Sequence, residues 1–186
     1  EASSRDRPAP DASGAGLIAA QSARAIMAGR IKTGEGSGTM SKQLAAIKPC
    51  LRPTPKVLVS CRSAKGENNA LAVGYACNCS FDPPMVMVGI VPSRYSYHMV
   101  KETGVFVANL VARDFEEQFM FLGSKSGRDM NKLEALGLKV ADGEKGNAPL
   151  LLDCPVCIEC TVVGSLMTGS HEMFAGQIAC IHADGV

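Results

Sequence analysis

The segment 76–97 constrains the fold more than any other part of the chain. A strand end of small and polar residues (76–80) leads into the turn Asp82–Pro83–Pro84, which is followed by an apolar strand (85–91) and a helix start rich in Ser, Arg and Tyr. The two prolines lack backbone donors and have a fixed φ, so the turn is rigid. Since 85–91 carries no polar side chain, it predicts a central strand covered on both faces.

The rest of the chain after residue 40 is also rich in strand patterns. Apolar runs at 57–59, 70–74 and 105–111 predict three further strands. Two long alternating segments, 156–166 and 171–181, are separated by a glycine-containing turn and predict a hairpin. The fold is therefore predicted to be mainly β: a closed or half-closed β-barrel with short peripheral helices.

Each of the three predicted helices stops at a glycine: Gly104, Gly123 and Gly137. Ser93 is placed as the N-cap of the first helix, and Asp114 with Glu117 forms a capping pattern for the second. The third is predicted to begin at Asp129.

Length and charge limit the function classes. The chain has 186 residues, 46% of them hydrophobic and 20% charged, which suits one domain with a substantial core. Nineteen basic and eighteen acidic residues leave a net charge of +1. We therefore expect neither nucleic acid nor a membrane as a partner, because these call for a basic excess or a long apolar run.

The two ends of the chain differ from the part between them. Residues 1–39 are rich in Ala, Gly, Ser and Arg and precede a natural translation start at Met40. They are predicted to be a disordered leader or expression-derived segment, with the domain at 40–186. A targeting peptide with a weak basic helix over 17–32 is the alternative, although acidic residues argue against it. The chain stops directly after a strand, so the domain is expected to lack a C-terminal segment.

Eight cysteines are embedded largely in apolar runs, so we predict free, mostly buried thiols in a reducing cytoplasm. Cys154, Cys157 and Cys160 have the spacing of metal ligands. On a strand, however, alternation sends Cys157 and Cys160 to opposite faces. No metal site is therefore predicted.

Ser93, Arg94 and Ser96 form a candidate anion site. Free backbone N–H groups at a helix start favour an anion, and a guanidinium suits phosphate. The alternative is a simple helix cap beside a solvated arginine. The loop 125–128 is a second basic turn that is either solvated or in contact with phosphate.

Two other places offer polar groups. Asn78, Cys79 and Ser80 leave room for a planar ring and offer hydrogen bonds to its edge, or are simply a polar strand end. His171, at a turn, has a pKa near neutrality and is a candidate for proton transfer or nicotinamide contact, or is merely exposed.

In order, these segments resemble the flavin reductase-like, FMN-binding split-barrel family, which includes flavoredoxin. The resemblance covers about residues 45–183. The segments that carry it are 55–60, 66–70, Asn78–Pro84, Ser93–Ser96, Phe106–Leu110, Asp129–Leu133, Ile158–Cys160 and Gly169–Ile178. Ser170 and Gln177 depart from the family's Asp and Glu, and Cys77 and Cys79 stand where hydroxyl residues are common.

The resemblance implies a homodimer with FMN at the subunit interface and hydride transfer from NADH or NADPH to the flavin. The phosphate is expected near Ser93, Arg94 and Ser96. The isoalloxazine ring is expected along Ala76, Cys77, Asn78, Cys79 and Ser80, approached by Asn68 or Asn69 and by His171 as the catalytic residue. An FMN reductase is the first hypothesis. The alternatives are a flavoredoxin-like carrier that exchanges electrons with a redox protein partner, and a cofactor-free binding barrel.

Overall fold

The computed structural model describes residues 42–185. The chain divides into two units, Glu1–Lys48 and Pro49–Val186, and all the helices and strands described here belong to the second. The predicted leader at 1–39, with its alternative basic helix, lies outside the described residues.

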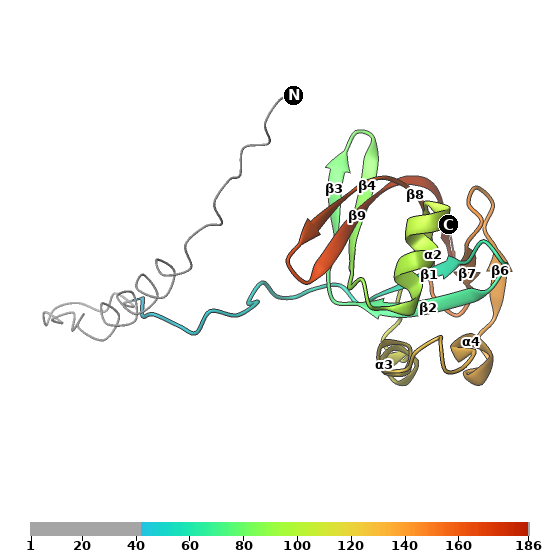
Figure 1. The fold of residues 1–186 in the computed structure, drawn as a ribbon, viewed down its shortest axis with the longest axis horizontal. Helices are drawn as coiled ribbons and strands as arrows, with labels where there is room; N and C mark the ends of the chain where they lie inside the picture. Colours follow the sequence, from blue (N-terminus) through green and yellow to red (C-terminus); the bar gives the residue numbers. More distant parts are fainter. Residues whose placement is uncertain (1–41, 186) are drawn as a thin grey trace, which may run out of the picture. The chain divides into compact units, whose positions relative to one another are not determined.

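Seven strands form one antiparallel sheet in the order β2-β1-β5-β8-β9-β4-β3 (Figure 1). Their bounds are β1 Val57–Arg62, β2 Asn68–Val73, β3 Ala76–Phe81, β4 Pro84–Ile90, β5 Val105–Leu110, β8 Val156–Thr168 and β9 His171–Ala183. The short strands β6 (Val140–Asp142) and β7 (Pro149–Leu151) pair in a second sheet. The helices are α2 (Tyr95–Thr103), α3 (Glu116–Ser124) and α4 (Lys132–Ala135).

The large sheet curls into a barrel around one hydrophobic cluster. Leu71 of β2 and Val88 of β4 belong to the same cluster, although four strands separate β2 from β4 in the strand order. Phe106 and Phe174 fill the space between them and are almost fully buried. Burial of one such side chain stabilises the fold by about 1.5–3 kcal/mol. The predicted β-barrel is confirmed.

A second cluster lies on the other face of the sheet. Leu58 and Val107 point into it from β1 and β5, while Leu133 and Leu150 reach it from α4 and β7. Because Val57 and Val59 face the barrel and Leu58 faces away, β1 is buried on both sides. The helices α3 and α4 therefore cover the outside of the barrel, as the sequence predicts.

β4 differs from its prediction in one respect. It lies between β9 and β3, so it is a central strand. Val86, Val88 and Ile90 are buried, but Met85 and Met87 are only partly buried. The prediction of coverage on both faces is therefore wrong for the first half of the strand.

The helix ends were predicted better than the helix starts, although α3 continues through Gly123 and its C-cap is Lys125. Gly104 follows α2 with φ 69°, and its N–H donates to the carbonyl of Val100. The N-cap residues of α2 and α3 are Arg94 and Phe115, without side-chain capping bonds, so the predicted caps at Ser93 and Asp114 are wrong.

The third helix is shorter than predicted. Asn131 caps α4 by accepting a hydrogen bond from the N–H of Glu134. Asp129 lies outside the helix, because its N–H donates to the carbonyl of Ser126 in the preceding turn.

The hairpin of β8 and β9 is confirmed and contains two irregularities. Glu159 pairs with Cys180, but Cys160 pairs with Ile178, so Ala179 is an extra residue on β9. Val163 is an extra residue on β8 between the pairs formed by its neighbours. Both are β-bulges, which bend a strand and increase its twist.

All eight cysteines lie among the described residues, and all are free thiols. Cys61, Cys154, Cys157 and Cys160 are buried, whereas Cys50, Cys77 and Cys79 are exposed, so burial is less general than predicted. Cys157 and Cys160 belong to different clusters, as strand alternation predicts. Within residues 42–185, no helix is long and apolar enough to cross a membrane.

Candidate phosphate-binding cavity

A cavity of about 190 Å³ lies where β2, the start of α2 and the α3–α4 connection meet. Its polar lining side chains share the ability to donate hydrogen bonds: Asn69, Ser93, Arg94, Ser96, Ser124, Lys125, Ser126, Arg128 and Lys132. Four of these carry a positive charge. The described lining includes no Asp or Glu. The cavity is therefore suited to an anion.

Lys132 is the buried cation of this cavity. It is 3% exposed, and its Nζ donates to the carbonyl oxygen of Leu122 at 3.0 Å. Burial lowers its pKa to about 8; the Cys61 thiol opposes this shift, and the nearby charge of Arg94 adds to it. An ammonium has three donors, so two N–H groups remain for a ligand. A bound dianion would compensate a charge that burial alone makes costly.

Asn69 and Ser96 form the floor of the cavity. The Nδ2 of Asn69 donates to Oγ of Ser96 at 2.7 Å, and both residues are buried. The serine hydroxyl accepts this bond, so its own proton is available to a ligand. This pair joins β2 to the first turn of α2 and fixes the position of the hydroxyl.

The basic loop 125–128 closes the cavity on its outer side. Nη1 of Arg128 donates to the carbonyl oxygen of Ser93 at 3.0 Å, and its guanidinium lies 5.7 Å from the ring centroid of Tyr95. A Cβ at Gly127 would lie 2.6 Å from Oδ1 of Asn69 and 2.5 Å from Tyr95. Only glycine therefore lets the loop come this close to the floor.

Four of the predicted site residues meet in this cavity: Asn69, Ser93, Arg94 and Ser96. Asn68 does not line it. Its Oδ1 accepts a hydrogen bond from Nε of Arg62 at 2.7 Å, and the residue faces a neighbouring cavity of about 400 Å³.

The residues predicted to contact the flavin ring lie elsewhere in the single chain. Ala76, Cys77, Asn78, Cys79 and Ser80 all belong to β3, which is the last strand of the sheet. The middle three are exposed, and none of the five lines the basic cavity.

His171 is separate from both groups. Its ring packs edge-on against Tyr75 with centroids 4.9 Å apart, and its Nδ1 lies 2.8 Å from Oγ of Ser170. Neither His171 nor Tyr75 lines the basic cavity.

Sequence reasoning missed Lys132 as a site residue. A lysine at the start of a short helix is usually solvated, and nothing in the sequence shows that the α3–α4 connection folds against β2. The sequence did contain one indication of a role for Lys132. The basic loop 125–128 lies only four to seven residues before it, and clustered basic groups are a common feature of anion sites.

The site fits a phosphate group. Charged donors, a buried hydroxyl and a glycine loop together match the chemistry of a phosphate dianion, which accepts several charge-assisted hydrogen bonds. FMN carries such a phosphate, so these residues fit the phosphate end of that cofactor.

The curled antiparallel sheet, its outer helices and this basic cavity define a split-barrel protein. A family model described as the flavin reductase like domain matches residues 51–185. The chain belongs to this family.

Three relatives show how close the similarity is. The flavoredoxin of Desulfovibrio vulgaris (Miyazaki F) has a TM-score of 0.72 and 28% sequence identity, covering 78% of each chain. An uncharacterised protein of Aeropyrum pernix is 31% identical over 140 residues, which is 75% of this chain and 53% of that protein. The FMN reductase (NADH) RutF of Bradyrhizobium diazoefficiens is 24% identical over 109 residues, which is 59% of this chain and 58% of that protein. The chain thus spans little more than half the length of the last two.

Proposed function

We propose that the chain is an FMN-binding oxidoreductase that accepts a hydride from NADH or NADPH. The basic cavity is the observation that carries the proposal. Arg94, Lys125, Arg128 and Lys132 bring four positive charges to one small space without a lining carboxylate. Family membership supplies the second support, since relatives include proteins named as FMN reductases.

In this proposal the residues of the basic cavity bind and position FMN. Lys132 and Arg94 neutralise the phosphate, while Ser96, held by Asn69, donates to it. When bound, FMN supplies the ring that accepts the hydride. We assign the ring to β3, where Asn78 and the backbone of Cys77 and Cys79 offer hydrogen bonds, with His171 as the candidate catalytic residue.

A homodimer completes this arrangement. β3 is exposed at the end of the sheet, and Phe81 at its end is 97% exposed. Leu166 and Met167, near the tip of the β8–β9 hairpin, are also exposed. A second copy covering these residues would bury apolar area and enclose the ring between subunits.

A flavoredoxin-like carrier is the second candidate function, favoured by the similarity to the Desulfovibrio flavoredoxin. It would hold FMN and exchange electrons with a redox protein partner. Anaerobic addition of NADH and of NADPH separates the two. Bleaching of the flavin absorption supports the reductase, whereas a flavin that stays oxidised with both donors favours the carrier.

We place the protein in the cytoplasm. Eight free thiols support this assignment, because thiols stay reduced there.

Substitution of Arg94 tests the cavity directly. In Arg94→Ala, FMN affinity should fall about 10- to 100-fold, corresponding to the roughly 1–3 kcal/mol of a lost charge-assisted hydrogen bond. Fluorescence quenching of FMN measures the dissociation constant. Arg113→Ala removes an exposed arginine that does not line the cavity and should bind FMN like the parent chain. Equal affinities in the two variants would refute the phosphate assignment.

A further inference from the structure

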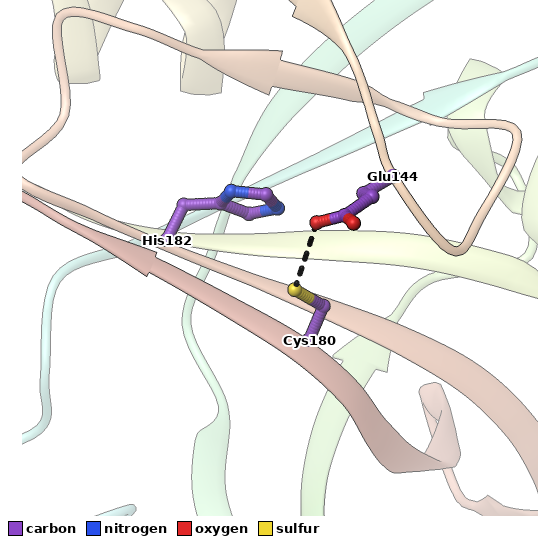
Figure 2. A group of neighbouring side chains, drawn as sticks. All are labelled: Glu144, Cys180 and His182. Carbon is purple, nitrogen blue, oxygen red and sulfur yellow. Dashed lines mark hydrogen bonds between the residues drawn. The ribbon is translucent and has the colours of Figure 1, made fainter.

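A second cluster of chemically reactive side chains lies away from the basic cavity. Glu144, Cys180 and His182 each offer one ligand atom, and these atoms all lie within 4.8 Å of one another. Figure 2 shows the three side chains converging, with the imidazole edge turned toward the carboxylate. Glu144 comes from the β6–β7 loop, whereas Cys180 and His182 are two positions apart on β9 and so share one face of the sheet.

The buried carboxylate of Glu159 holds this cluster in place. It is 1% exposed and accepts hydrogen bonds from the backbone N–H groups of Glu144, Lys145 and Gly146 at 2.7–2.9 Å. Its Oε1 also lies 2.6 Å from Nε2 of His182. One buried group on β8 thus fixes the loop that carries Glu144. It also pairs with the imidazole through Nε2, so a metal bound at this nitrogen would replace that hydrogen bond.

The same carboxylate leaves little freedom to the loop. A Cβ at Gly143 would lie 2.5 Å from Oε2 of Glu159 and 2.7 Å from the carbonyl oxygen of Gly146. Glu159 is paired with Cys180 across the ladder, directly beside the bulge at Ala179. Two ligands are therefore on a strand, and the third is on a turn tied to the neighbouring strand.

The spacing suits a small metal ion. Zinc binds Cys sulfur at about 2.3 Å and His nitrogen or carboxylate oxygen at about 2.0–2.2 Å, so its tetrahedral ligands lie roughly 3.3–3.8 Å apart. Sγ of Cys180 is 3.8 Å from Oε2 of Glu144. A sulfur, a nitrogen and an oxygen ligand together favour zinc over calcium or magnesium, which prefer oxygen alone.

We propose that Glu144, Cys180 and His182 bind a zinc ion, with Glu159 positioning the β6–β7 loop that carries Glu144. Three protein ligands leave a fourth coordination position for water. The ion joins the β6–β7 loop to β9. It therefore helps to hold this loop against the outer face of the barrel. This proposal departs from the sequence-based expectation of no metal. Of the cysteines considered there, Cys157 and Cys160 lie on β8 and Cys154 lies just before it.

Zinc binding to the full chain tests the proposal. The protein is stripped with a chelator, dialysed against zinc, and analysed for metal content and affinity by competition with a chromophoric chelator. One zinc per chain is expected. Cys180→Ser and His182→Gln should each weaken binding by at least about tenfold, and Glu159→Gln by about 10- to 100-fold, the range for a residue that orients a ligand.

Matched controls separate this site from adventitious binding. Cys50→Ser and His98→Gln alter an exposed cysteine and an exposed histidine outside the cluster and should keep the parent affinity. Glu144→Gln changes an exposed side chain, so its loss of zinc cannot be attributed to a damaged core. FMN affinity should stay unchanged in this variant, because Glu144 does not line the basic cavity.

X-ray absorption of the zinc-loaded chain gives an independent readout. One sulfur at about 2.3 Å with nitrogen and oxygen at about 2.0–2.2 Å supports the assignment. Two or more sulfurs, no bound zinc, or equal affinity in the parent chain and in Cys180→Ser overturns it.

Discussion

Lys132 is the residue on which the basic cavity depends most. It is buried, its only hydrogen-bond partner among the described residues is the carbonyl oxygen of Leu122, and burial brings its pKa down to about 8. Its charge therefore changes within a pH range in which the protein can be studied.

The pKa of Lys132 predicts how FMN affinity depends on pH. Below pH 8 the ammonium is charged and attracts the phosphate; above pH 8 the free protein loses this charge. Affinity should therefore be about tenfold lower at pH 9 than at pH 7 through this one proton. In Lys132→Met, FMN affinity should be weaker than that of the parent chain at pH 7, and it should not fall further between pH 7 and pH 9. Fluorescence titrations at both pH values measure it.

Lys139→Met is the matched control, because Lys139 is exposed and lies outside the cavity. It should keep both the affinity and the pH dependence of the parent chain. If Lys132→Met retains the pH dependence, the responsible proton belongs to another group.

Some residues of the two sites could be predicted from the sequence and others could not. Arg94 and Ser96 were found because a helix start is visible in the sequence. Lys132 was not, because its position depends on the packing of the α3–α4 connection against β2. Glu144 was missed for the same reason: a loop residue meets Cys180 only after the sheet has formed.

At the scale of elements, α2 is tied to the hairpin by a buried carboxylate. Glu172 of β9 accepts hydrogen bonds from Tyr97 and Lys101 of α2 and from Ser165 of β8. These donors, with Lys101 contributing most, lower the pKa of Glu172 to about 2. The network joins a helix and two strands.

This network predicts how stability changes in acid. A carboxyl group with a lowered pKa stabilises the fold above its unfolded pKa of 4.5 and loses that contribution as pH falls toward 2. Glu172→Gln should therefore be less stable than the parent chain at pH 7. The difference between the two should shrink at pH 3, as measured by urea unfolding.

Glu102→Gln, also at the α2 surface but exposed, is the control and should match the parent chain at both pH values. A constant difference between Glu172→Gln and the parent chain from pH 7 to pH 3 would mean that the carboxylate charge is not the stabilising feature.

The strands and two of the three helix ends were predicted correctly from local patterns, whereas the predicted N-cap residues were wrong. Gly104 and Gly137 both adopt positive φ, a backbone requirement that is visible in the sequence. The cap at Ser93 failed because the turn before α2 is closed by backbone bonds, including that from Arg94 N–H to Val91. The strands β6 and β7, of three residues each, are too short to show a period.

At the scale of the whole molecule, the exposed end of the sheet predicts association. Phe81→Asp places a charge in the proposed interface and should prevent the proposed homodimer from forming, because a buried unpaired charge is costly. Light scattering coupled to size exclusion gives the mass. FMN affinity should fall with it if the ring lies between subunits.

Leu152→Asp changes a residue that is 52% exposed and lies just beyond β7, away from β3 and the hairpin tip, and should remain dimeric. A parent chain that is monomeric at all concentrations, or a dimeric Phe81→Asp variant, would exclude β3 as the interface.

The two bulges in the hairpin of β8 and β9 indicate where the chain can gain or lose a residue. Ala179 shifts the pairing register by one residue, and Val163, on the opposite strand, shifts it back. The residue pairs near the turn therefore have the same register as those at the open end of the hairpin. Both extra residues are exposed. Insertions and deletions of one residue are therefore expected to be tolerated at these two positions, because every other residue of the hairpin keeps its partner and its face.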